Sequence, residues 1–136
     1  MQEATVGHQG KLSFRVERTF SNPDLTIDDL IVTAELPGLR AGKRVWDFDG
    51  WSGLLSFFDE LAHNWRGWHG EKTFDSIEGD LRLTAKHDGH VRIAFELREF
   101  AGATPWRAQG ELALDPDEEQ TAAAEPLRDL LAGTKP

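Results

Sequence analysis

Residues 81–97, LRLTAKHDGHVRIAFEL, decide the fold of this chain. Apolar and polar side chains alternate on both sides of Asp88-Gly89, and a period of two residues is typical of a half-buried β-strand. Asp-Gly is a strong two-residue hairpin signal, because both residues tolerate the positive φ angles of a primed turn. The stretch therefore predicts an antiparallel hairpin with one apolar face, made of Leu81, Leu83, Ala85, Val91, Ile93, Phe95 and Leu97.

Four more segments read as strands. The same alternation runs from Leu12 to about Phe20 and from Leu30 to Leu36, more weakly from Arg44 to Phe48, and again from Trp106 to Leu114. Turn residues separate them, among them the cluster 21–24 and the pair Pro37-Gly38. Strands in runs, without strand–helix alternation, predict an α+β domain with a mostly antiparallel sheet of about five to six strands.

Two helices complete the expected fold. Apolar residues from Trp51 to Trp65 recur at helical spacing, with Asp49 as the expected cap and Gly67 just beyond the end. This long amphipathic helix follows the third strand and should cover one face of the sheet. A short acidic helix is expected to begin at Asp115, and Pro126 is expected to break or kink it.

Composition fits one domain over residues 1–136, with flexible ends at about 1–9 and 133–136. The chain has 136 residues, 39% of them hydrophobic, and no cysteine, so a core forms without disulfides. The first residues contain no apolar stretch typical of a secretory signal, and no apolar run reaches the roughly 20 residues of a membrane-spanning helix. We therefore expect a cytoplasmic protein that does not insert into a membrane.

The net charge of −9 bears on the partner. An acidic surface repels the phosphates of nucleic acid and attracts basic proteins. The chain is therefore expected to bind a basic protein and no nucleic acid. The alternative is that the acidity serves solubility alone.

The segment 65–80 supplies the candidate contact residues. Tryptophan and arginine are enriched among the residues that dominate binding energy, so Arg66 and Trp68 are candidates for a partner-binding surface. Glu71, Asp75 and Glu78 follow as acidic contacts. The alternative is that the tryptophans close the core at the helix end and the acids cap turns.

Residues 69–90 also allow a catalytic or metal-binding hypothesis. His87 and His90 would lie opposite each other in a two-residue hairpin, with His69, Glu71 or Asp75 as a remote third ligand. The carboxylates of Glu71, Asp75, Glu78 and Asp80 could pair as general acid and base, and a Ser76–His87–Asp88 triad can be written. No zinc spacing or nucleophile elbow accompanies them. We therefore predict no enzyme, and assign no catalytic residue, metal ligand or cofactor.

Several short motifs resemble a known family. They are the helix end 64–68 (NWRGW), the Gly70-Glu71 step, the turn 76–80 (SIEGD) and the hairpin 87–90 (HDGH). Over roughly residues 45–100 the chain resembles the uncharacterised family called domain of unknown function 6228, and more distantly it is similar to WapI-like immunity proteins. The distant similarity implies a cytosolic protein that neutralises a toxin by binding it. The alternatives are a ligand- or metal-binding domain or enzyme using residues 69–90, and a self-associating accessory subunit.

Overall fold

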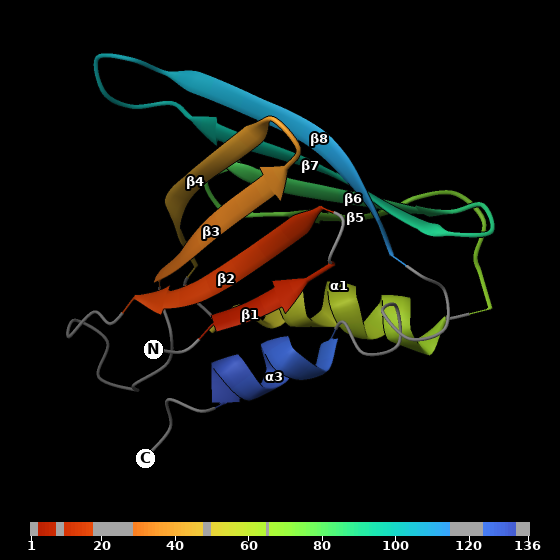
Figure 1. Cartoon of the computed structure of the whole chain (residues 1–136). Helices are drawn as coiled ribbons and strands as arrows, with labels where there is room; N and C mark the ends of the chain where they lie inside the picture. Colours follow the sequence, from red (N-terminus) through yellow and green to blue (C-terminus); the bar gives the residue numbers. More distant parts are fainter. Residues whose placement is uncertain are drawn as a thin grey trace.

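Two four-stranded antiparallel sheets and two helices make up the part of the chain that the computed structural model describes, which is residues 3–7, 10–17, 29–47, 50–64, 66–114 and 124–132 (Figure 1). The first sheet has the order β1-β2-β3-β4, formed by Glu3–Val6, Lys11–Glu17, Asp29–Leu36 and Leu39–Trp46. The second has the order β5-β6-β7-β8, formed by Lys72–Asp75, Leu81–His87, Val91–Glu99 and Trp106–Leu114. Helix α1 spans Ser52–His63 and helix α3 spans Ala124–Ala132.

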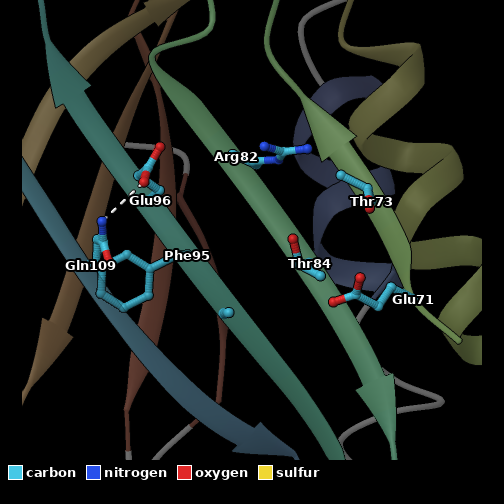
Figure 2. A pocket seen from close by; sticks show the side chains of 8 residues that line it. Glu71, Thr73, Arg82, Thr84, Phe95, Glu96 and Gln109 are labelled. Carbon is cyan, nitrogen blue, oxygen red and sulfur yellow. Dashed lines mark hydrogen bonds between the residues drawn. The ribbon is translucent and has the colours of Figure 1, made fainter.

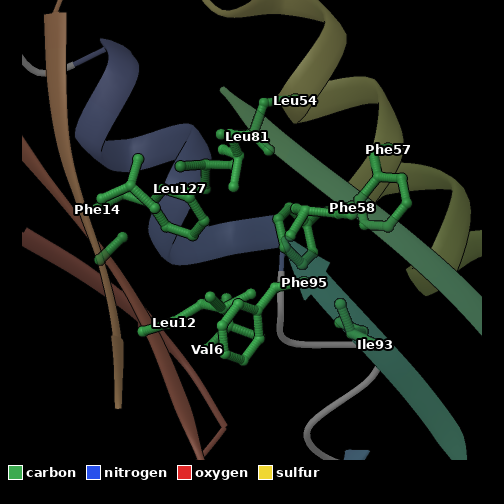
Figure 3. Packing of buried hydrophobic residues seen from close by; sticks show 14 of the residues in the cluster. Val6, Leu12, Phe14, Leu54, Phe57, Phe58, Leu81, Ile93, Phe95 and Leu127 are labelled. Carbon is green, nitrogen blue, oxygen red and sulfur yellow. The ribbon is translucent and has the colours of Figure 1, made fainter. Parts of the chain in front are cut away.

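One apolar core joins all these elements. Because side chains alternate along a strand, each sheet turns one apolar face inward and one polar face outward. The inward residues of both sheets pack with the buried faces of α1 and α3, as Figure 3 shows for Phe14, Phe95, Phe58 and Leu127. Both helices lie on the same side of the sheets (Figure 1). The helix face predicted from the sequence is therefore part of a core shared by two sheets.

Helix α1 begins with a buried aromatic residue. Trp51, which has no exposed surface, precedes the helix in the left-handed conformation with φ 69°, and its N–H donates to Asp47 Oδ2 at 2.8 Å. A carboxylate at this position accepts from an otherwise unpaired backbone donor near the positive end of the helix dipole. The N-cap position is therefore occupied by Trp51, which makes no side-chain cap bond, and Asp47 binds the N–H of this residue; the expected cap Asp49 lies outside the described residues. An ion pair between Asp59 and Arg128 joins α1 to α3.

A buried ion-pair cluster links the two sheets where β4 lies against β7. The Lys43 side chain is 11% exposed, and its Nζ lies 3.0 Å from Asp80 Oδ2, 3.4 Å from Glu99 Oε2 and 3.2 Å from the Arg98 carbonyl. Ser76 Oγ donates to Asp80 Oδ1 at 2.6 Å and accepts from the Leu81 N–H. We call Lys43, Ser76, Asp80 and Glu99 the Lys43 cluster.

The α+β class and the antiparallel pairing are confirmed, but the strand number and the single sheet are wrong. The described residues contain eight strands in two sheets. Strand β1 lies within the expected flexible end 1–9, and β5 was not predicted as a strand. The weak strand expected to begin at Arg44 corresponds to β4, which begins at Leu39. It is the fourth strand of the chain and not the third, so α1 follows four strands.

One local prediction is also wrong. The β6–β7 loop contains three residues, because His87 pairs with Val91 and the Asp88 N–H bonds to the His90 carbonyl. The helix expected to begin at Asp115 and to break at Pro126 lies mostly outside the described residues; within them, Pro126 lies in the first turn of α3, where proline's missing N–H costs nothing. The predicted turn 21–24, the cap Asp115 and Trp65 lie outside the described residues.

Candidate protein-binding surface at one end of the second sheet

The structure places Trp68 differently from the other expected contact residues. Trp68 is partly buried against the core, and its ring meets the His87 ring edge-on at 5.3 Å between centroids. Lys72 Nζ lies 5.5 Å from the centre of the same indole. Arg66 is exposed in the segment between α1 and β5. Trp68 is therefore half core residue and half surface residue.

The three acidic candidates divide between the two ends of β5. Glu71 and Asp75 are exposed on the outer face, where Glu71 lies 3.5 Å from Lys86 and Asp75 lies 3.3 Å from Arg82. Glu78 is exposed in the turn before β6. Asp75 and Glu78 thus lie near the β5–β6 turn, whereas Glu71 lies with Arg66 and Trp68 toward the opposite end. The expected contact set does not form one patch.

The geometry does not support the catalytic and metal hypotheses for residues 69–90. His87 lies opposite Val91 and not opposite His90, and the described residues hold no group of three or more His, Asp or Glu side chains that could bind a metal. Ser76 precedes β6 and His87 ends it, so about 20 Å separates them, too far for a triad. Asp80 is buried against Lys43 and so is not an acid–base partner of the exposed carboxylates.

Arg92, at the start of β7, forms ion pairs with Asp88 in the β6–β7 loop and with Glu111 on β8. Arg92 Nε lies 3.2 Å from Asp88 Oδ1, and Arg92 Nη1 lies 3.4 Å from Glu111 Oε1. The hydrogen bond from Arg92 is the main cause that lowers the pKa of the Asp88 carboxyl below its ordinary value of 3.8. The same hydrogen bond raises the pKa of Arg92. Asp88 therefore stabilises the hairpin and does not act as a proton donor near neutral pH.

A shallow trough crosses the outer face of the second sheet (Figure 2). Its volume is about 370 Å³, and small side chains such as Thr84 and Ala94 lie between longer charged ones. Glu96 accepts from the Gln109 amide at 3.0 Å along one side. The lining residues are Glu71, Thr73, Arg82, Thr84, Ala94, Phe95, Glu96 and Gln109. Most of the side chains that line this trough are polar or charged.

An exposed apolar group lies where the second sheet ends. Phe100 is 58% exposed, Ile77 48% and Trp106 37%. Arg98 links Phe100 to the turn between β5 and β6 that carries Ile77, because its guanidinium lies 4.8 Å from the centre of the Phe100 ring and its Nη2 donates to the Gly79 carbonyl at 2.8 Å. Trp106 pairs with Glu99, the residue before Phe100. We call Ile77, Phe100 and Trp106 the apolar end.

Sequence reasoning missed the apolar end, although one signal was present. Residues 100–106, FAGATPW, contain no charged side chain, whereas 29% of the whole chain is charged, and all seven are exposed. Trp46, 40% exposed, ends β4 and projects from the other sheet. Monomeric proteins seldom expose grouped aromatic side chains without a use for them. The apolar end is therefore the best candidate surface in the described part of the chain.

Fold and surface together define a small α+β domain of two antiparallel sheets and two core helices, with an exposed aromatic end. The chain belongs to the Family of unknown function (DUF6228), whose model matches residues 4–134. The family resemblance drawn from residues 45–100 is thus confirmed and covers nearly the whole chain.

No curated protein and no solved structure is detectably similar to the chain. The similarity to WapI-like immunity proteins is therefore not supported by the comparisons with known proteins. Among the described residues, no helix has the length and apolar character that crossing a membrane requires.

Proposed function

We propose that this chain is a protein-binding domain that contacts its partner through the apolar end. The observation that carries the proposal is that Ile77, Phe100 and Trp106 are all exposed at the same end of the second sheet, where Arg98 lies over the Phe100 ring. Aromatic and arginine side chains dominate the energy of protein interfaces, because they bury large areas and keep a polar group for hydrogen bonding. Arg98 is held by Phe100 and by the Gly79 carbonyl, so little further conformational entropy is lost on binding.

A basic protein is the partner that the charge favours. The exposed carboxylates of Asp75 and Glu78 lie beside the apolar end, and the chain carries a net charge of −9. The Asp75–Arg82 ion pair is more than half exposed on both sides, so it contributes little and can exchange partners with an incoming cation. Such a partner fits a cytoplasmic, immunity-type protein that neutralises a basic toxin by binding it.

The two alternative functions, metal or ligand binding and self-association, would each use a different surface and give a different signal. A metal- or ligand-binding role would use the trough or the side chains of 69–90, and titration calorimetry with zinc, nickel and manganese would detect it. A self-associating subunit would use the apolar end against a second copy, and light scattering over a concentration series would show dimers. The protein-binding proposal expects neither signal.

The test compares three immobilised baits in a lysate of the native host. The wild-type chain and Ala113→Ser, an exposed change on the outer face of β8, should retain the same basic protein at low salt. Phe100→Ser should retain it at least about tenfold less, since a central aromatic residue typically contributes 2 kcal/mol or more. Equal recovery on all three baits, or no specific protein on any, would contradict the proposal.

A further inference from the structure

We infer that Lys43, a residue of the first sheet, is a positioning residue for the apolar end, because its ammonium group binds residues at the ends of both loops that carry exposed apolar side chains. One loop is the turn 76–80 between β5 and β6, which carries Ile77, and the other is the segment 100–105 between β7 and β8, which carries Phe100. The inference rests on the proposed function for what the apolar end binds. The placement of the loops is measured without a partner.

The ammonium group of Lys43 has three acceptors, one for each of its N–H donors. Its Nζ lies 3.0 Å from Asp80 Oδ2, 3.2 Å from the Arg98 carbonyl oxygen and 3.4 Å from Glu99 Oε2. Asp80 is the last residue of the turn 76–80, and Glu99 directly precedes Phe100. One side chain of the first sheet therefore binds the ends of two loops of the second sheet.

The turn that carries Ile77 is bonded within itself and to Arg98. The Gly79 N–H donates to the Ser76 carbonyl at 3.0 Å, and Ser76 Oγ donates to Asp80 Oδ1 at 2.6 Å. Arg98 donates to this turn twice, from its backbone N–H to the Asp80 carbonyl and from Nη2 to the Gly79 carbonyl, both at 2.8 Å. Ile77 is thus exposed on a turn whose conformation and place on the sheet are both fixed by hydrogen bonds.

Phe100 directly follows the residues of β7 that contact Lys43. Glu99 Oε2, which faces Lys43, also accepts from the Ala101 N–H at 3.4 Å. The Arg98 guanidinium lies 4.8 Å from the centre of the Phe100 ring. The backbone and the ring of this part of the loop are therefore both bound by residues that Lys43 contacts.

Stability alone gives no reason for a lysine at this position. Lys43 occupies an inward position of β4, in line with Ala41 and Val45, and its side chain is only 11% exposed. Apolar side chains of similar size often replace a buried ion pair without loss of stability, or with a gain. An apolar side chain, however, cannot orient two polar loop ends. Loops that are ordered before binding lose less conformational entropy when a partner binds.

Fluorine NMR of the full chain with 4-fluorophenylalanine at position 100 tests the positioning without a partner. Glu99→Ala should move this resonance toward its position in the urea-unfolded chain. The Glu99 side chain is 35% exposed, so the variant should stay folded, with a urea midpoint lowered by no more than about 0.5 M. Glu99→Gln keeps an oxygen that can accept from Lys43 and from the Ala101 N–H, and it should restore the wild-type resonance.

The same resonance tests Lys43 directly. Lys43→Met removes all three bonds and should move the Phe100 resonance at least as far as Glu99→Ala does. Arg40→Met, on the same strand, should not move it. The inference is wrong if Lys43→Met or Glu99→Ala leaves the resonance at its wild-type position, or if Glu99→Gln moves it as far as Glu99→Ala.

The Glu99 variants, used as baits in the host lysate, test the consequence for binding. Glu99→Ala should retain the basic protein about twofold to tenfold less than the wild-type chain, because the loop must then be ordered on binding. Glu99→Gln, which lacks the same charge, should retain the wild-type amount. Undiminished recovery on Glu99→Ala would overturn the inference and leave the proposed function intact. If the wild-type bait retains no specific protein, the proposed function fails, and the fluorine resonance still decides whether Lys43 positions the loops.

Discussion

Replacing Lys43 by methionine should destabilise the domain far more than replacing any exposed lysine or arginine. The substitution keeps the length of the side chain and removes the charge that faces Asp80 at 3.0 Å, where Asp80 is only 4% exposed. Removing one partner of a buried ion pair typically costs 3–5 kcal/mol, because the remaining charge is left uncompensated. Ser76 continues to donate to Asp80, and the Glu99 side chain is 35% exposed, so we expect the lower limit, about 3 kcal/mol.

Urea unfolding followed by tryptophan fluorescence measures this loss. With a denaturant slope of about 2 kcal/mol/M, the midpoint should fall by about 1.5 M. The control is Arg40→Met on the same strand, whose ion pair with Glu35 at 3.9 Å is largely exposed and should change stability by no more than about 0.5 kcal/mol. Asp80→Asn combined with Lys43→Met should cost less than Lys43→Met alone, since no buried charge is then left unpaired.

Two outcomes would refute the reasoning. If Lys43→Met lowers the free energy of unfolding by no more than Arg40→Met does, the Lys43 cluster does not stabilise the contact between the sheets. If the double variant loses as much unfolding free energy as the two single variants together, the Lys43–Asp80 ion pair is not what stabilises the cluster.

Three further predictions concern other parts of the fold. Asp47→Ala removes the acceptor of the Trp51 N–H and should cost about 1 kcal/mol in urea unfolding, so a change near zero would contradict the role of this hydrogen bond at the start of α1. Trp68→Ala should be folded and lose less stability than Trp51→Ala, for which about 3–5 kcal/mol is expected; equal losses would make Trp68 a full core residue. The pKa of Asp88 is lowered by its hydrogen bond from Arg92, so its contribution to stability is present above its unfolded pKa and is lost as pH falls through the folded value. An NMR titration of Arg92→Gln should return that pKa toward 3.8, and an unchanged value would contradict the assigned cause.

The sequence predicted the strands that have a full alternating pattern. Strands β6 and β7 were read correctly because seven to nine residues each repeat the period of two. Strands β1 and β5 have only four residues each, too few for an alternation to stand out. The division into two sheets was not predictable from periodicity, because an inward face looks the same whether it meets a helix or another sheet.

The apolar end was not predicted from the sequence, and the Lys43 cluster left only one sign in it. Lys43 occupies an inward position of β4, in line with Leu39, Ala41 and Val45, and this break in the apolar pattern was the available sign of a buried charge. Its partner Asp80 is 37 residues away in the sequence, so only the packing of the two sheets reveals the pair. The expected contact residues were chosen by composition, which cannot tell that Trp68 folds back onto His87 or that the two ends of β5 carry separate groups.

Site-specific photo-crosslinking at the apolar end tests the central proposal most directly. A photoreactive phenylalanine at position 100, in the native host, should form a covalent adduct with one basic protein, because Phe100 is the most exposed aromatic residue among those described. The same group at position 113, on the outer face of β8, should give no such adduct. Adducts that are equal at both positions, or absent at position 100, would contradict a partner-binding role for the apolar end.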